Sequence, residues 1–231
     1  MTFEVCTDSV DGAIAAARYG AKRIELCSAL SVGGLTPNFG LIKACVAAAP
    51  IEVHCMIRHK EGGFIYNAED VAVMKEDISA VKNAGAHGVV FGILTNDYEI
   101  SYLNKELFEY AVSLDLEVTF HRAFDFTHDY HKAIQQLISI GFDRLLTSGQ
   151  EKTAYEGIKV ISDIQNQYGN QIQIMAGAGV NANNAKELAA TGIQNLHFTA
   201  RKPAYGATSL SMGELMIPDD DKIQNIINQF N

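Results

Sequence analysis

Basic residues are scarce in this sequence. Lys and Arg together number 18 against 27 Asp and Glu, which gives a formal net charge of −9 at pH 7. A bulk nucleic-acid binder would carry the opposite sign, and an anionic membrane surface would repel such a chain, so we expect neither partner. The sequence has no run of about 18 apolar residues, so we expect no transmembrane helix. Its first residues lack a basic stretch followed by an apolar one, so we expect no signal peptide.

Cysteine is scarce as well. The four cysteines are Cys6, Cys27, Cys45 and Cys55, and their spacing matches neither a zinc finger nor a Cys-x-x-Cys redox pair. Without an export signal we expect free thiols rather than disulfides, and a cytoplasmic protein. No Gly-x-Gly-x-x-Gly loop, which would indicate a dinucleotide site, follows the first apolar run. The sequence therefore implies no organic cofactor.

The main feature of the sequence is a repeated unit. A helix-like segment ends at a glycine, an apolar residue follows, and a short β-rich run comes next, as after Gly20, Gly85, Gly141 and Gly192. Glycine fits the left-handed position that ends a helix, and a short apolar run fits a buried parallel strand. Eight such runs occur, at residues 3–6, 23–27, 52–57, 88–91, 117–120, 144–147, 173–175 and 195–198. They predict an α/β protein, a single (β/α)8 TIM barrel over residues 1–231, with 202–231 forming a rim loop and the last helix.

A doubly wound open sheet is the structural alternative, although that fold usually needs fewer units. Three of the intervening helices have recognisable ends. One covers residues 37–49, with Thr36 as N-cap and Pro37 in its first turn. A second covers 68–84 and is capped by Asn67, and the last covers 220–230, where apolar residues recur at steps of three and four.

Two of the cysteines fall where the strands of such a barrel end, which is where barrel active sites lie. Cys6 closes the first strand and Cys27 the second, and neighbouring strands are about 4.8 Å apart. Two thiols so placed fit a soft ion such as Cu(I), with Met56 available as a third ligand, whereas the alternative is ordinary packing. Cys45 and Cys55 are expected to be core residues.

The loops after the seventh and eighth strands have the composition of an anion site. Their glycines let backbone N–H groups approach an anion, and an arginine grips carboxylate or phosphate with two hydrogen bonds. The loop after the sixth strand contributes further residues to the same predicted anion site. The alternative is a set of turns made of small residues. The candidate anion-binding residues are Ser148, Gly149, Gly177, Gly179 and Arg201.

Titratable side chains converge on the same rim. A carboxylate beside a histidine is a common acid–base pair, and strand alternation puts Glu25 on the same face as Cys27. Inside an apolar barrel Glu25 needs a partner, for which Arg58 and Arg122 are available, and a purely structural ion pair is the alternative. The candidate catalytic residues are Glu25, Arg58, His121, Asp125 and His197.

Several of these segments together resemble one known family. They are residues 4–9, 23–28, 33–37, 56–58, 118–125 and 146–150, together with His197 and Arg201. On them the chain resembles the CutC family, which is named for copper homeostasis. The resemblance implies a barrel, a cytoplasmic location and Cu(I) binding, with Cys6 and Cys27 at the family's cysteine positions. The chain departs from the family at His59 and Lys60, where Pro-Arg is usual.

Two functional hypotheses follow. The first is a cytoplasmic copper homeostasis protein of the CutC type, which binds Cu(I) through thiols at the C-terminal rim of the barrel. The second is a TIM-barrel enzyme that performs acid–base chemistry on a small anionic or phosphorylated metabolite. We also expect residues 202–218 to form a mobile lid or a subunit contact, and the chain to form a homodimer.

Overall fold

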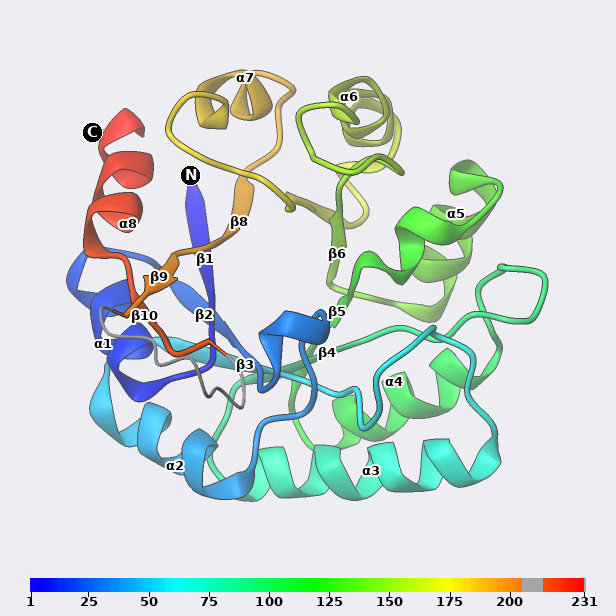
Figure 1. The fold of residues 1–231 in the computed structure, drawn as a ribbon. Helices are drawn as coiled ribbons and strands as arrows, with labels where there is room; N and C mark the ends of the chain where they lie inside the picture. Colours follow the sequence, from blue (N-terminus) through cyan, green and yellow to red (C-terminus); the bar gives the residue numbers. More distant parts are fainter. Residues whose placement is uncertain (205–213, 231) are drawn as a thin grey trace.

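Eight parallel strands close into a barrel in their order along the chain. The computed structural model describes residues 1–204 and 214–230, and Figure 1 shows helices surrounding the strands. β1 pairs with both β2 and β8, so this eight-stranded barrel is closed. The predicted (β/α)8 fold is confirmed. The strands are β1 (Thr2–Thr7), β2 (Arg23–Leu26), β3 (Glu52–Met56), β4 (Gly88–Phe91), β5 (Glu117–Phe120), β6 (Arg144–Thr147), β7 (Gln173–Ala176) and β8 (Asn195–Thr199).

Helices follow the strands and cover their outer face. They are α1 (Val10–Arg18), α2 (Phe39–Ala48), α3 (Ala68–Asn83), α4 (Leu103–Ser113), α5 (Tyr130–Ile140), α6 (Ile158–Tyr168), α7 (Ala185–Ala189) and α8 (Asp220–Ile227). Short 3-10 turns add η1 (Leu30–Val32), η2 (Arg122–Phe126) and η3 (Asn228–Phe230). The four glycines that were expected to end helices all have positive φ, among them Gly141, which caps α5 at φ 112°. Among the described residues, no helix is long and apolar enough to cross a membrane.

Helix starts show where local prediction worked and where it failed. Asn67 caps α3 in a reciprocal capping box with Asp70, as expected. The expected cap Thr36 is wrong, because α2 begins at Phe39 and its N-cap is Asn38. Thr36 is occupied elsewhere: its hydroxyl accepts from the Arg58 backbone N–H at 3.0 Å and donates to Asp77 at 3.1 Å.

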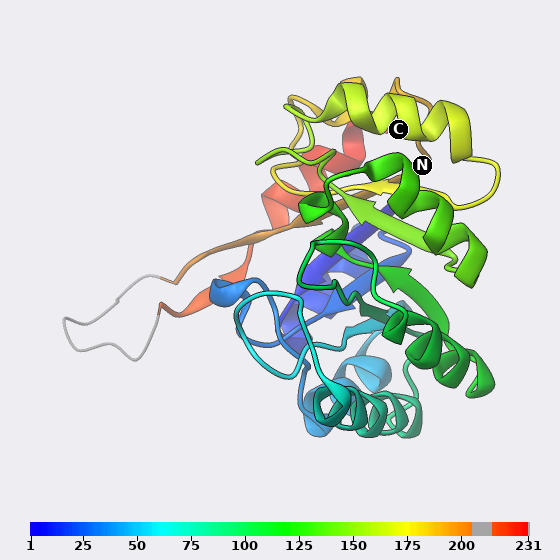
Figure 2. The same ribbon diagram turned by 90° about the vertical axis from the view of Figure 1, so that its right-hand side faces the viewer.

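The segment after β8 contains two short strands that the sequence did not predict. β9 (Arg201–Pro203) and β10 (Met216–Pro218) pair as an antiparallel ribbon. In Figure 2 this ribbon extends from the side of the barrel that also carries η1. The expected lid or subunit contact of residues 202–218 falls largely on 205–213, which lie outside the described residues. The homodimer stays a prediction.

The two faces of the barrel strands differ in chemistry. The outward face is apolar and packs against the helices, with Val5, Ile24, Val53, Val89, Val118, Leu145, Ile174 and Leu196 all in the main hydrophobic core. Cys45 and Cys55 also lie in this core, as expected. The inner side instead holds buried charges near the strand starts: Glu4 and Arg23 form an ion pair, and Arg144 pairs at 3.0 Å with the exposed Glu117. This division leaves the carboxyl ends of the strands for the cavity described next.

Candidate functional site

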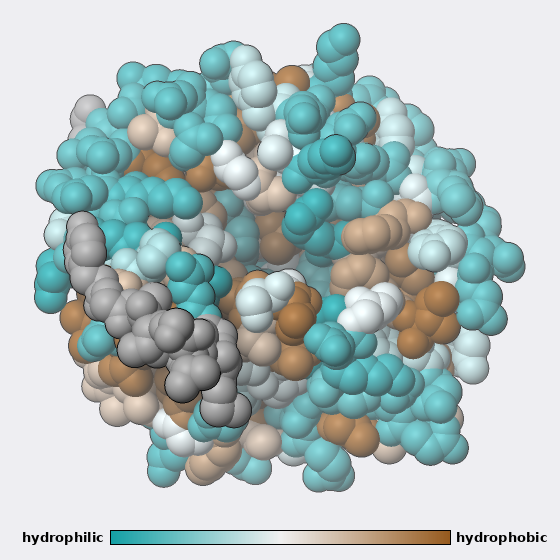
Figure 3. All heavy atoms as spheres, in the orientation of Figure 1, coloured by the Kyte–Doolittle hydropathy of each residue, from teal (hydrophilic) through white to brown (hydrophobic). Residues whose placement is uncertain are grey.

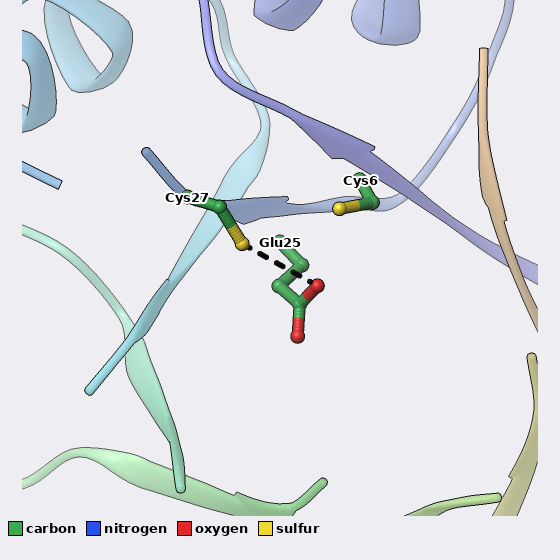
Figure 4. Close-up of side chains that lie close together, drawn as sticks. All are labelled: Cys6, Glu25 and Cys27. Carbon is green, nitrogen blue, oxygen red and sulfur yellow. Dashed lines mark hydrogen bonds between the residues drawn. The ribbon is translucent and has the colours of Figure 1, made fainter. Parts of the chain in front are cut away.

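Cys6, Glu25 and Cys27 come together at the carboxyl ends of β1 and β2 (Figure 4). Cys6 and Glu25 are register partners on the two strands, and Cys27 follows directly after β2. Their two sulfur atoms and one Glu25 carboxylate oxygen all lie within 4.8 Å of one another. The Cys27 thiol donates to Glu25 Oε2 at 3.6 Å. The juxtaposition expected from strand alternation is therefore present, and all three side chains are buried.

His197 of β8 adds a fourth polar side chain to this cluster. Its Nδ1 lies 2.8 Å from Glu4 Oε1, and its Nε2 lies 3.7 Å from Glu25 Oε2. The second oxygen of Glu4 accepts from Arg23 Nε. Because Glu4 is held on both oxygens, the imidazole of His197 is fixed with one edge toward Glu25.

The four titratable side chains of the cluster have shifted pKa values. The neighbouring Cys27 thiol lowers the pKa of Cys6 well below its ordinary value, against the effect of burial. The interaction with Cys6 and burial together raise the pKa of Cys27. Burial and the neighbouring Cys6 charge raise the pKa of Glu25. Burial opposes a charge on His197, but Glu25, Cys6 and Glu4 together raise the pKa of His197. The cluster thus favours a Cys6 thiolate beside a protonated His197.

A cavity of about 590 Å³ opens above this cluster. Cys6, Glu25, Met56 and His197 line it, together with apolar side chains from the loops: Leu30, Val32, Phe64, Ile65, Leu94, Phe126 and Val180. Figure 3 looks onto the face where the strands end and shows a central hollow that hydrophobic and hydrophilic groups both border. The cavity has the size and the mixed lining of a small-molecule site.

Arg58 does not pair with Glu25, and neither does Arg122, so both expected partners are wrong. Arg58 donates instead to three loop carbonyls, those of Val32 at 3.0 Å, Gly34 at 2.9 Å and Gly62 at 2.7 Å. Arg122 pairs with Asp125 at 2.8 Å. Glu25 therefore has Cys6, Cys27 and His197 as its polar neighbours, because carbonyls of the loops after β2 and β3 bind the guanidinium of Arg58.

His121 faces the same cavity as a neutral base. Burial and the nearby positive charge of Arg58 lower the pKa of His121 to about 3. Its Nδ1 accepts from the Ala123 backbone N–H at 3.3 Å, and the Phe64 ring packs edge-on against it at 4.8 Å. Of the five candidate catalytic residues, the structure brings Glu25, Arg58, His121 and His197 to the cavity wall.

Asp125 lies away from the cavity lining and organises the loop after β6. Its carboxylate accepts from the Thr147 hydroxyl at 2.5 Å, from the Ser148 backbone N–H at 3.0 Å and from the Ser148 hydroxyl at 2.8 Å. It also accepts from the Gln150 backbone N–H at 3.2 Å. With Arg122 as a further donor, this carboxylate has the surroundings of a structural anchor.

The candidate anion-binding residues are dispersed. Among the described residues, Gly179 is the one member of this set that lines the cavity. Arg201 pairs with Asp8 at 2.5 Å. Ser148 is bound to Asp125, Gly149 N–H donates to the Thr147 hydroxyl at 2.9 Å, and Gly177 N–H donates to a β6 carbonyl at 2.9 Å. The donors of Ser148, Gly149 and Gly177 are used within the fold, and the anion role of the five residues stays a prediction.

Comparison with known proteins gives the family. The family model described as the CutC family matches residues 1–202. The chain belongs to the CutC family. A CutC family protein from Glaesserella parasuis serovar 5 (strain SH0165) is 41% identical over 238 residues, covering 98% of each chain. One from Aliivibrio fischeri (strain MJ11) is 44% identical over 200 residues, covering 86% of this chain and 81% of its own.

Solved structures agree with the CutC assignment. The CutC crystal structure from Streptococcus agalactiae, described as a candidate copper homeostasis protein, is 33% identical with a TM-score of 0.78. It covers 86% of this chain and 98% of its own. A 3-hexulose-6-phosphate synthase is 14% identical with a TM-score of 0.65, covers all of both chains, and shows a common fold alone.

Two parts of this CutC-family site were missed by reasoning from sequence. Glu4 shares the inward face of Cys6, so strand alternation carried the signal, but its bond to His197 depends on barrel closure. The Phe64 and Phe126 rings lie 5.4 Å apart in the cavity wall, although they come from loops after different strands. No sequence spacing relates these two loops, because the fold alone brings them together.

Proposed function

We propose that this CutC family member binds Cu(I) in copper homeostasis, at Cys6 on the floor of the barrel cavity and at Cys27, which is buried beside it. The observation that supports this most is the placement of two sulfur atoms and a Glu25 oxygen within 4.8 Å of one another. Thiolates are soft ligands that suit Cu(I). Met56 packs in the same small cluster as the two cysteines and offers a soft thioether.

The electrostatics of the cluster favour a monovalent cation there. Cys6 already has a lowered pKa, and Cys27 donates its proton toward Glu25 Oε2 at 3.6 Å. Because metal binding displaces thiol protons, Cu(I) binding would release the Cys27 proton to solvent and give the second thiolate, while Glu25 keeps its own proton. The resulting two-thiolate Cu(I) complex carries one negative charge, which a protonated His197 beside it balances.

The compartment is part of the proposal. All four cysteines are free thiols, and Cys6 and Cys27 bind Cu(I) only while reduced. Reducing compartments such as the cytoplasm keep thiols in that state. We therefore propose that the protein handles copper in the cytoplasm.

An oxygen-free Cu(I) titration against a competing chelator tests the copper proposal. We expect wild type to bind one ion per chain and Cys6→Ser/Cys27→Ser to lose that binding. Cys45→Ala/Cys55→Ala is the matched control, because these two thiols lie in the outer core and leave the cavity pair intact. Weak binding by wild type, or binding that the serine variant keeps, would contradict the proposal.

A second candidate function is acid–base chemistry on a small anionic metabolite. The observation that favours it is a raised pKa of Glu25 beside a raised pKa of His197, both at the floor of the 590 Å³ cavity. A thermal-shift screen of anionic metabolites on the copper-free protein tests it. A ligand at 100 times its dissociation constant adds about 2.7 kcal/mol of stability. A hit must also be converted, at a rate that Glu25→Gln abolishes, for this function to stand.

A further inference from the structure

Arg58 is a buried cation without an ion-pair partner among the described residues. It is 4% exposed, and its guanidinium donates to three backbone carbonyls rather than to a carboxylate. Of the five N–H donors of an arginine, these bonds use two on Nη1 and one on Nη2. The Nε donor has no partner among the described residues. A buried charge left without a counterion is costly, so this arrangement is poised for an anionic ligand.

Neighbouring residues hold Arg58 in place before any ligand arrives. Its backbone N–H donates to the Thr36 hydroxyl at 3.0 Å, and the Thr36 N–H donates to the Arg58 carbonyl at 3.0 Å. The side chain is fixed by carbonyls from the loops after β2 and β3. The buried hydroxyl of Tyr66, which lies outside the cavity lining, also interacts electrostatically with Arg58. Fixed donors of this kind bind an anion with little loss of side-chain freedom.

The charge of the cavity lining has the opposite sign to that of the whole protein. Arg58, Arg122 and Lys222 line the cavity, against one carboxyl group, Glu25, and Asp125 behind the lining neutralises Arg122, which leaves Arg58 and Lys222. The whole chain has a formal net charge of −9. A cleft lined by one sign of charge attracts ligands of the other sign. The cavity therefore selects anions although the protein as a whole repels them.

The wall beside Arg58 fits an apolar ligand body. The guanidinium lies over the Phe64 ring at 5.5 Å, and the Phe126 ring lies 5.4 Å beyond Phe64. Phe126 is 53% exposed, and Ile65 and Val32 nearby in the lining are also exposed. Exposed apolar side chains grouped at a cavity mouth are typical of a ligand groove.

We infer that this cavity binds an organic oxyanion, a carboxylate or phosphate on a ring-sized apolar body, with its charged group on Arg58 and its body along Phe64 and Phe126. This ligand would be the substrate class of the second candidate function, with Arg58 as its anchor. Its conversion rests on that proposed function, whereas its binding requires neither catalysis nor copper. The anchor also differs from the predicted anion residues, because Arg201 is already neutralised by Asp8.

Calorimetric titration of the copper-free protein with four small probes tests the inference. Phenylacetate and phenyl phosphate carry the oxyanion on a ring, phenylacetamide removes the charge, and acetate removes the ring. We expect one or both ring anions to bind at least about tenfold more tightly than phenylacetamide and than acetate, since a charged hydrogen bond is worth roughly a factor of ten or more. The preferred ring anion then distinguishes a carboxylate site from a phosphate site.

Variants locate the anchor. Arg58→Gln should weaken the preferred ring anion about tenfold and leave phenylacetamide unchanged, whereas Arg201→Gln, a matched loss of charge outside the cavity lining, should leave both unchanged. The probe comparison on wild type holds even if Arg58→Gln misfolds. Equal affinities for acid and amide, no binding of either ring anion, or loss of binding in Arg201→Gln would overturn the inference. Binding without conversion of any ligand would instead refute only the second candidate function.

Discussion

His197 Nδ1 and Glu4 Oε1 lie 2.8 Å apart across the seam where β8 meets β1. The same Glu4 accepts from Arg23 of β2, so one carboxylate joins three strands at the point where the barrel closes. Through this bond the closure of the fold fixes the imidazole that faces Glu25 and Cys6. The residues that seal the barrel and those that form the candidate site are therefore one connected network.

Removing the Glu4 charge should destabilise the whole barrel. Glu4→Gln leaves the buried Arg23 with Glu52, at 3.5 Å, as its remaining carboxylate partner among the described residues. Breaking a buried ion pair costs about 3–5 kcal/mol, so urea unfolding should show a loss of that size. The control is Glu106→Gln, which removes an exposed pair with Lys75 at 2.6 Å and should cost less than about 1 kcal/mol. Similar losses in both variants would contradict this prediction.

Cys6 should be the reactive thiol of the four. Its pKa is lowered by the Cys27 thiol and it lines the cavity, whereas burial raises the pKa of Cys45 to about 11 and that of Cys55 further. Iodoacetamide labelling at pH 7, followed by mass spectrometry, should modify Cys6 first. Labelling the unfolded chain, where all four thiols react alike, is the control.

The pH dependence of the labelling rate separates reactivity from access. An ordinary thiol with a pKa near 8.5 reacts more than about tenfold faster at pH 9 than at pH 7. Cys6, whose pKa is lowered, should show a much smaller rise in rate over this interval. A rise in parallel with an ordinary thiol would show that access alone sets its labelling.

Much of the fold could be predicted from the sequence because short apolar runs and helix-ending glycines recur along the chain. Short apolar runs predicted all eight barrel strands, four of them directly after a helix-ending glycine, and alternation along the strands predicted that Cys6 and Cys27 meet at the rim. Local reasoning failed where a side chain serves a distant segment. Thr36 bonds to Arg58 and Asp77 instead of capping a helix, and no nearby residue indicates that.

The candidate site was less predictable than the fold, for a physical reason. Charge alone suggested Arg58 as a partner for Glu25, but three loop carbonyls bind the guanidinium instead. Every residue has a backbone carbonyl, so residue types do not indicate which carbonyls a side chain will bind. Asp125 was expected at the reaction centre because it lies at a strand end. Asp125 does lie beyond the carboxyl end of β5, but backbone N–H groups of the loop after β6 bind its carboxylate.

Glu25 should make stability fall as the pH rises. Burial raises its folded-state pKa above the ordinary 4.5, so the folded protein holds a proton that the unfolded chain releases. The contribution of Glu25 is fully present below about pH 4.5 and is lost as the pH rises through the raised value. We expect Glu25→Gln to match wild type in thermal stability near pH 4.5 and to exceed it at pH 8. A difference that stays constant across this range would contradict the raised pKa.

Asp125 should prove to be a structural anchor rather than a catalytic group. Asp125→Asn presents an amide N–H₂ to donors that include the Thr147 hydroxyl at 2.5 Å and Arg122 at 2.8 Å. Loss of such a buried network should cost on the order of 3 kcal/mol in urea unfolding. Asp8→Asn, which breaks a part-exposed pair with Arg201, is the control and should cost less than about 1 kcal/mol.

Because Asp125 lies outside the cavity lining, the folded Asp125→Asn variant should keep wild-type affinity for Cu(I) and for the ring anions. Unchanged stability together with lost ligand binding would contradict this prediction and show that Asp125 acts in the binding site.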